Sequence, residues 1–110
     1  MSIEDAMKNF EEHAKKLNTI LDGVSNNIRE VEGFLQKTEC NYPFKWNIPN
    51  TKDYILWEKG AYGKKFRLFL KIGQFRSSKP FIEHKGDIRI KYSAHLEDFI
   101  KALQLFIRLP

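Results

Sequence analysis

The sequence predicts an α+β domain made of a long N-terminal helix, an antiparallel meander of three or four strands, and a C-terminal helix packed on one sheet face. Two changes of hydrophobic period support this. Apolar residues recur at alternating steps of four and three through residues 3–35, the period then drops toward two, and it becomes helical again after residue 93. We interpret residues 1–40 as a helical, coiled-coil-like segment and residues 41–110 as the sheet plus C-terminal helix, together forming one compact domain.

The N-terminal third carries an unbroken heptad stripe. Its spacing is typical of a helix that buries a narrow apolar seam against another helix. Ser2 with Asp5 three residues later is a plausible helix start. The stripe consists of Ile3, Met7, Phe10, Ala14, Leu17, Leu21, Val24, Ile28, Val31 and Leu35.

Two interpretations of this stripe stay open, because residues 21–27 (LDGVSNN) are rich in turn formers. Either a single helix runs through, or two helices form a hairpin broken near Gly23. Placing Gly23, Ser25 and the two asparagines in a helix costs roughly 2 to 3 kcal/mol against alanine. Burying the neighbouring stripe residues offsets this, at roughly 1.5 to 3 kcal/mol each. The stripe also keeps its phase across the segment, which favours the continuous helix.

A continuous helix has a consequence for assembly. Thirty-five residues span roughly 52 Å at 1.5 Å per residue, whereas strands of six to nine residues span roughly 20 to 30 Å. The helix must therefore extend beyond its own sheet. An exposed apolar stripe in water predicts a homo-oligomer, most simply a dimer, with Met7, Phe10, Ala14, Leu17, Leu21, Val24, Ile28, Val31 and Leu35 as the seam. In the hairpin interpretation, the same residues pack within the monomer.

Period-two alternation predicts strands at residues 42–48, 54–59, 64–72 and 87–92. The GAYG stretch at residues 60–63 is interpreted as a hairpin loop. Residues 73–86 are expected to form a longer connection with a short extended piece at 80–83. Ser93 is the expected N-cap of the last helix, whose broad apolar face consists of Leu96, Phe99, Ile100, Leu103, Phe106 and Ile107.

Charge is divided unevenly along the chain. Residues 1–40 carry a net charge of −3 and residues 41–110 carry +8. If the C-terminal helix covers one face of the sheet, we expect cations and an aromatic side chain on the other, with Trp57 or Ile55 on a neighbouring strand. Such a face suits an acidic protein surface or single-stranded nucleic acid. The expected binding residues are Arg67, Phe69, Lys71, Arg89 and Lys91, with Arg76, Lys79 and Lys85 in the adjoining loop.

Motifs for catalysis, metals and cofactors are weak. His13, His84 and His95 are far apart in the sequence, and no phosphate-binding glycine loop or paired-cysteine motif accompanies them. We therefore expect no metal, cofactor or catalytic residue. The one grouping with acid–base potential is Glu83, His84 and Lys85, expected beside Arg67 and Arg89, which leaves a small ribonuclease-like toxin as a remote alternative.

The functional expectation is a small cytoplasmic, oligomeric protein-interaction or adaptor module. The main alternative is a nucleic-acid-binding protein that uses the basic sheet face. The sequence has no apolar stretch that could span a membrane and no basic-then-apolar leader. A single cysteine, Cys40, agrees with a reducing compartment.

Overall fold

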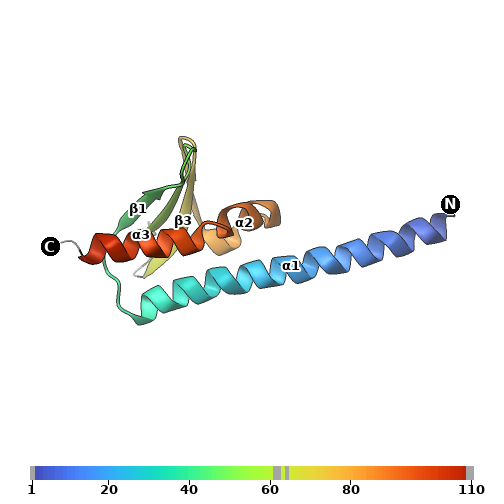
Figure 1. Cartoon of the computed structure of the whole chain (residues 1–110), viewed down its shortest axis with the longest axis horizontal. Helices are drawn as coiled ribbons and strands as arrows, with labels where there is room; N and C mark the ends of the chain where they lie inside the picture. The colour runs from blue at the N-terminus through green and yellow to red at the C-terminus, as the bar shows by residue number, and fades with distance from the viewer. Residues whose placement is uncertain (1, 61–62, 64, 109–110) are drawn as a thin grey trace.

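The computed structural model describes residues 2–60, 63 and 65–108. Helix α1 (Ile3–Lys37) is followed by strands β1 (Phe44–Asn47), β2 (Tyr54–Lys59), β3 (Phe66–Ile72) and β4 (Phe75–Pro80). A 3₁₀ turn η1 (Phe81–Glu83) and helices α2 (Gly86–Ser93) and α3 (Leu96–Arg108) complete the chain. The predicted α+β class, with an antiparallel meander and a C-terminal helix on the sheet, is confirmed (Figure 1).

Helix α1 is one continuous helix of 35 residues, so the hairpin alternative is wrong. The Ser2 hydroxyl accepts a hydrogen bond from the backbone N–H of Asp5 (3.1 Å) and caps the first turn, as the sequence predicted. Gly23 lies on the exposed side, with no atom near the position of a side chain. Gly23, Asn26 and Asn27 face solvent, whereas Ser25 is buried, and the apolar stripe continues uninterrupted through this segment.

The four strands form an antiparallel sheet in the order β1-β2-β3-β4. Strand β2 pairs with β1 through Trp57 opposite Phe44, and with β3 through Trp57 opposite Leu68. The β2–β3 connection contains the predicted glycine loop, of which residues 61 and 62 lie outside the described part of the chain. Strand β4 was not predicted: it occupies part of the expected connection. A two-residue turn precedes it, where Gly73 has a positive φ of 61°.

The last predicted strand, residues 87–92, is wrong, because this segment is helix α2. Ile88 and Tyr92 lie four residues apart, so they share a helix face as well as a strand face, and both pack against the core. Ser93 consequently ends α2 instead of capping α3, and its hydroxyl donates to the Ile90 carbonyl (3.2 Å).

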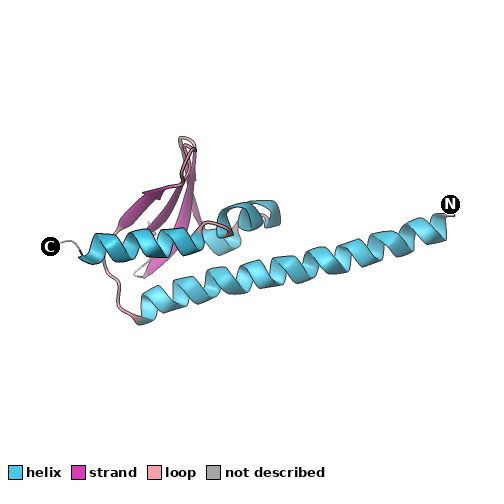
Figure 2. Ribbon diagram, in the orientation of Figure 1, coloured by secondary structure: helices cyan, strands magenta, loops and turns pink. Residues whose placement is uncertain are grey.

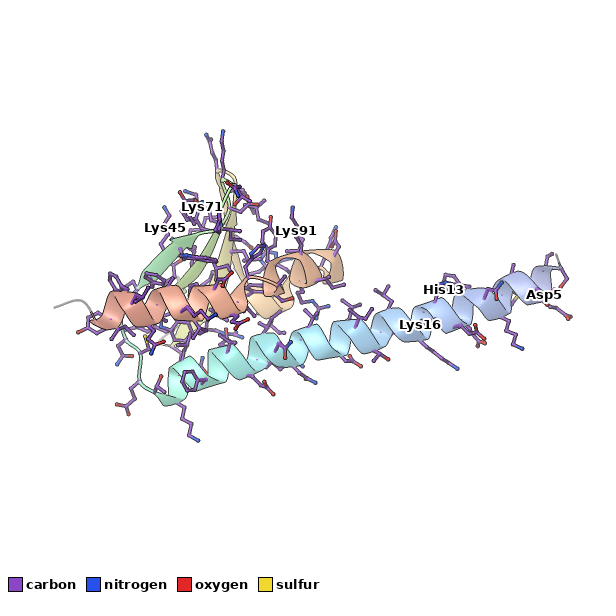
Figure 3. All side chains as sticks on the ribbon, viewed as in Figure 1. Asp5, His13, Lys16, Lys45, Lys71 and Lys91 are labelled. Atoms are coloured by element: carbon purple, nitrogen blue, oxygen red, sulfur yellow. The ribbon has the colours of Figure 1, made fainter. Side chains whose placement is uncertain are left out.

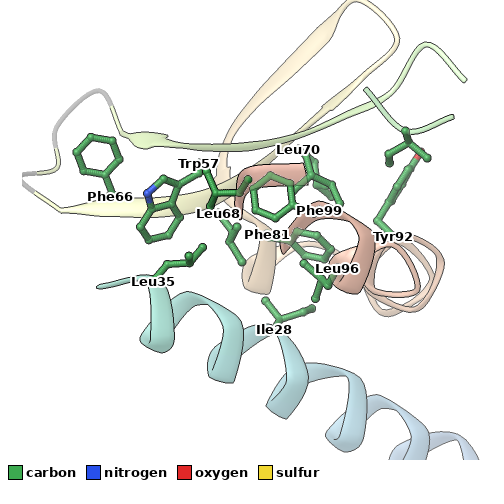
Figure 4. Close-up of a cluster of buried hydrophobic side chains, with 13 residues drawn as sticks. Ile28, Leu35, Trp57, Phe66, Leu68, Leu70, Phe81, Tyr92, Leu96 and Phe99 are labelled. Carbon is green, nitrogen blue, oxygen red and sulfur yellow. The ribbon is translucent and has the colours of Figure 1, made fainter. Parts of the chain in front are cut away.

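The core lies between the sheet and the helices, which are all on one side of the sheet (Figures 2 and 4). Helix α3 packs against β1, where the Phe99 ring lies 5.7 Å from Phe44 and 6.2 Å from Trp46. Helix α1 contributes Ile28 and Leu35 from below. The sheet contributes Ile55, Trp57, Phe66, Leu68 and Leu70, and Ile48 joins them from the end of β1.

Candidate functional site

The heptad stripe of α1 is divided between two environments. Its C-terminal half packs inside the monomer: Ile28 and Leu35 are buried, and Val24 and Val31 are half-buried against the same core. Leu21 is half-buried beside Gly86, the first residue of α2. This half of the predicted seam is thus already occupied by the chain's own body, meaning the sheet with η1, α2 and α3.

The N-terminal half of the stripe extends beyond the body, as the length of the helix predicted (Figure 1). The molecule measures 65 × 29 × 28 Å, and its long dimension follows α1. We call residues 3–20 the overhang. Ala14 is half-buried. The large apolar side chains of the overhang are open to solvent: Ile3 is 79% exposed, Met7 65%, Phe10 74%, Leu17 49% and Ile20 52%.

Charged side chains border the overhang stripe. Glu4 and Glu11 follow stripe residues directly, and Lys8 and Lys16 lie further round the helix. Figure 3 shows Asp5, His13 and Lys16 on the part of α1 that lies away from the body. The His13 ring nitrogen Nδ1 lies 2.7 Å from the Asn9 carbonyl within the same helix. Among the described residues, the side-chain hydrogen bonds of the overhang stay within α1.

Two side chains of α1 fix the helix along one edge of β3. The Glu32 carboxylate, only 7% exposed, accepts hydrogen bonds from the Leu68 backbone N–H (2.9 Å) and from Arg67 Nη2 (3.0 Å). One turn later, Gln36 Nε2 donates to the Phe66 carbonyl (3.0 Å). Strand β4 pairs with β3 only as far as Phe69, so these side chains satisfy backbone groups that β4 leaves free. The direction of the overhang is set by this attachment.

The basic sheet face predicted from the sequence is not assembled as expected. Arg89 and Lys91 lie on α2, and Arg89 donates to the Ser25 hydroxyl of α1 (2.5 Å). Arg67 faces Glu32 and, at 3.9 Å, Glu83. Phe69 does point to the face opposite the helices, but it is only 3% exposed and so offers no ring for stacking.

The two residues of β2 expected on that face, Ile55 and Trp57, lie on the other face of the sheet. Ile55 and Trp57 belong to the core side of β2 and are fully buried. Trp57 Nε1 donates to the Cys40 carbonyl (2.8 Å), which satisfies its one polar atom. Of the expected loop cations, Arg76 and Lys79 lie on β4 and Lys85 precedes α2, so they do not form one cluster.

Lys71 does lie on the outer face, as the sequence predicted, but its grouping there with Lys45 and Tyr54 was not predicted. Lys45 Nζ lies 4.5 Å from the centroid of the Tyr54 ring, and Lys71 Nζ lies 5.3 Å from the same centroid. Arg76 forms an ion pair with Glu58. The alternation of residues 44–47 and 54–59 would have placed Lys45 and Tyr54 on this face, had it been followed across both strands.

A second polar cluster joins the segment before β2, the β3–β4 turn and helix α2. The Asp53 carboxylate accepts hydrogen bonds from the Tyr92 hydroxyl (2.7 Å) and the Gly73 N–H (2.9 Å). The Tyr92 hydrogen bond is the main reason that the pKa of Asp53 is lowered. Burial, reinforced by Asp53, raises the pKa of Tyr92 to about 12. The two groups hydrogen-bond to each other, which indicates a structural role.

Of the grouping considered for ribonuclease chemistry, the structure brings Glu83 beside Arg67, as expected from the sequence. Glu83 is exposed and faces Arg67, whereas His84 is half-buried with no hydrogen-bond partner for its Nε2 among the described residues. Burial lowers the pKa of His84. Within the described chain, no three His, Cys, Asp or Glu side chains are grouped as metal ligands.

Comparisons with protein-family models, with curated proteins and with solved structures found no match. Among the described helices, none has both the length and the apolar character that crossing a membrane requires.

Proposed function

We propose that the chain is a small protein-interaction module that self-associates through the overhang of α1. The observation that carries this proposal is the exposure of Ile3, Met7, Phe10 and Leu17, which keep the spacing of a helix-pairing seam. A reducing compartment such as the cytoplasm remains our proposed location, since Cys40 has no cysteine partner in the sequence.

The position of the body limits whether two overhangs can pair in a parallel or an antiparallel arrangement. From Leu21 onward, the stripe is covered by the chain's own α2 and core. A parallel partner helix lying on the overhang would run its C-terminal half into this body. An antiparallel partner avoids the collision, because its C-terminal half continues past the N-terminus of the first copy. We therefore propose an antiparallel dimer with a two-fold axis.

The spacing of the stripe sets the register of this dimer. In an antiparallel pair, stripe residues of the two copies face each other when Met7 lies opposite Leu17 of the second copy and Phe10 lies opposite Ala14. In the same register, Ile3 reaches the half-buried Leu21, next to α2. Each acidic N-terminal tip then approaches the basic α2 region of the other copy, which carries Lys85, Arg89 and Lys91. This charge complementarity favours a second copy as the partner.

The energies are consistent with a reversible dimer. Burying partly exposed side chains of this size contributes roughly 1 to 1.5 kcal/mol each, scaled from roughly 1.5 to 3 for full burial. The four large stripe side chains of each overhang together supply on the order of 8 to 12 kcal/mol in the dimer. Association itself costs roughly 4 to 15 kcal/mol. We expect an affinity nearer micromolar than nanomolar.

Light scattering after size-exclusion chromatography tests the proposal. We expect a mass of twice 13.0 kDa for the wild-type chain at micromolar concentration. The combined variant Met7→Glu, Phe10→Glu and Leu17→Glu should be monomeric and still folded, because these side chains are 49 to 74% exposed in the monomer. Phe34→Glu, an exposed apolar residue of α1 off the stripe, is the control and should remain dimeric. A wild-type monomer at all concentrations would refute the proposal.

A further inference from the structure

The outer face of the sheet carries a row of cationic and aromatic side chains across all four strands. Tyr54 of β2 lies opposite Lys71 of β3, and Lys71 lies opposite Arg76 of β4. On β1, Lys45 lies two residues from the position opposite Tyr54, on the same face. Figure 3 shows Lys45 and Lys71 on the sheet, away from α1. No helix of the described chain packs on this face.

The two lysines are unusual because they approach the same ring. Both ammonium groups lie within about 6 Å of the Tyr54 centroid, the range of a cation–π contact. Among the described residues, neither forms an ion pair with a carboxylate, although Arg76 nearby does. The two lysines therefore flank Tyr54 from β1 and β3, and each ammonium group is available to an anion at the surface of the sheet.

A hollow lies beside the lysines. Glu58 neighbours Arg67 and Arg76 neighbours Lys71, so the Glu58–Arg76 ion pair crosses β3 over Phe69, the residue between them. This explains why Phe69 is buried on a face without a helix. The hollow has a volume of about 370 Å³ and is lined by Pro43, Phe44, Lys45, Leu56, Glu58, Lys71, Gln74 and Arg76.

We propose that this outer face binds the phosphate backbone of a single-stranded nucleic acid, with phosphates at Lys45 and Lys71 and a base against the apolar side of the hollow. Rows of cations beside aromatic and apolar side chains on a sheet suit a single strand. A single strand can bend into a hollow that a rigid duplex cannot enter. The net charge of +8 on residues 41–110 attracts such a polyanion from a distance.

The hollow beside the lysines favours a nucleic acid over an acidic protein surface, because a base offers a flat ring to the apolar lining while the phosphates lie at the cations. Arg76 is already paired with Glu58. The unpaired cations at this site are the two lysines, which bind phosphate as point charges. The inference does not depend on self-association, because the overhang and the outer face are separate surfaces.

Fluorescence anisotropy with a short labelled single-stranded RNA of mixed sequence tests the inference at several salt concentrations. Wild-type protein should bind with an affinity that falls steeply with salt. The double variant Lys45→Gln and Lys71→Gln should bind at least tenfold more weakly, and its plot of log affinity against log salt should be shallower by about 0.7 per lost phosphate contact. Lys101→Gln, on α3 at the opposite side of the sheet, should bind like wild type.

Three results would overturn the inference. The first is no binding of the RNA at low salt, and the second is equal binding by the double lysine variant and the wild type. The third is stronger binding of a polyglutamate peptide than of the RNA at the same site, which would identify an acidic protein partner instead. Circular dichroism confirms that each variant is folded. The oligomeric mass of the double variant, expected to equal that of wild type, separates failure of this site from failure of the overhang.

Discussion

Single residues decide where α1 is attached, and Glu32 is the clearest case. Its carboxylate is buried against the Leu68 N–H and Arg67. Because Glu32→Ala leaves a buried backbone N–H without an acceptor, we expect it to lower the free energy of unfolding by about 1 to 3 kcal/mol. Urea denaturation measures this. Glu30→Ala, at an exposed position of the same helix, should change stability by less than about 0.5 kcal/mol. Equal effects of the two substitutions would contradict the role assigned to Glu32.

The Tyr92 hydroxyl gives the fold a measurable response to alkaline pH. In the folded state its pKa is raised to about 12, against 10.0 for an ordinary tyrosine. The unfolded chain therefore loses this proton first, so the stabilising contribution of Tyr92 is complete below pH 10 and is lost as the pH rises toward 12. Tyr92→Phe should be less stable at neutral pH and should lose less stability above pH 10. Tyr42→Phe, at an exposed ring, should follow the wild-type pH profile; a Tyr92→Phe profile parallel to wild type would argue against the hydrogen bond to Asp53.

His84 makes the stability of the fold depend on acid pH. Burial lowers its folded-state pKa below 6.5, so the unfolded state binds the proton more readily. Stability should therefore fall as the pH drops below about 6.5. Thermal unfolding of His84→Gln should show a smaller loss between pH 7 and pH 5 than wild type does. The comparison with His13→Gln, on the exposed overhang, controls for general effects of removing a histidine. Identical slopes in all three proteins would show that His84 is not responsible.

At the level of elements, long periodic patterns were predictable and short ones were not. The ten-residue stripe identified α1 across its turn formers, and alternation identified β2 and β3. Strand β4 was missed because its sequence, FRSSKP, is polar and its pairing with β3 is supplied by the tight turn at Gly73. Helix α2 was misassigned because eight residues carry too few apolar positions to distinguish the two periods, and packing against α1 decided the outcome.

The candidate surfaces were also predictable only in part, because they depend on packing between residues far apart in the chain. The stripe was visible in the sequence, but its division at Leu21 depends on where α2 packs, which involves residues far away in the chain. The basic face was predicted with Arg89 on a strand, so the error in α2 removed two of its cations. Lys45 and Tyr54 belong to separate strands, and only the register brings both lysines to one ring.

The contact between α1 and α2 is close enough to test by substitution. A Cβ added at Gly86 would lie 2.7 Å from Leu21 Cδ2, which is too short for both atoms to stay in place. Gly86→Ala should therefore lower the free energy of unfolding by about 1 kcal/mol or more. In a Leu21→Ala background the clash disappears, and the same substitution should be neutral or stabilising. Equal costs of Gly86→Ala in both backgrounds, measured by urea denaturation, would show that the two elements do not pack as described.

The molecule is elongated because the N-terminal half of α1 packs against no other element of the described chain. The body holds one end of α1 through Glu32, Gln36 and the core, and it leaves the other end open to solvent. The covered half also dictates the direction from which a second copy can approach. At this scale, we therefore propose that the chain self-associates in an antiparallel arrangement.

A spin-label distance measurement tests that claim most directly. Glu30→Cys in a Cys40→Ala background places one label on the exposed side of α1 in each copy. With Phe10 opposite Ala14, the two labels lie roughly 55 Å apart along the paired helices at 1.5 Å per residue. Double electron–electron resonance should therefore show a distance near this value. A distance below roughly 25 Å would show parallel helices, and the absence of any intermolecular distance at concentrations well above micromolar would show that the overhang does not self-associate.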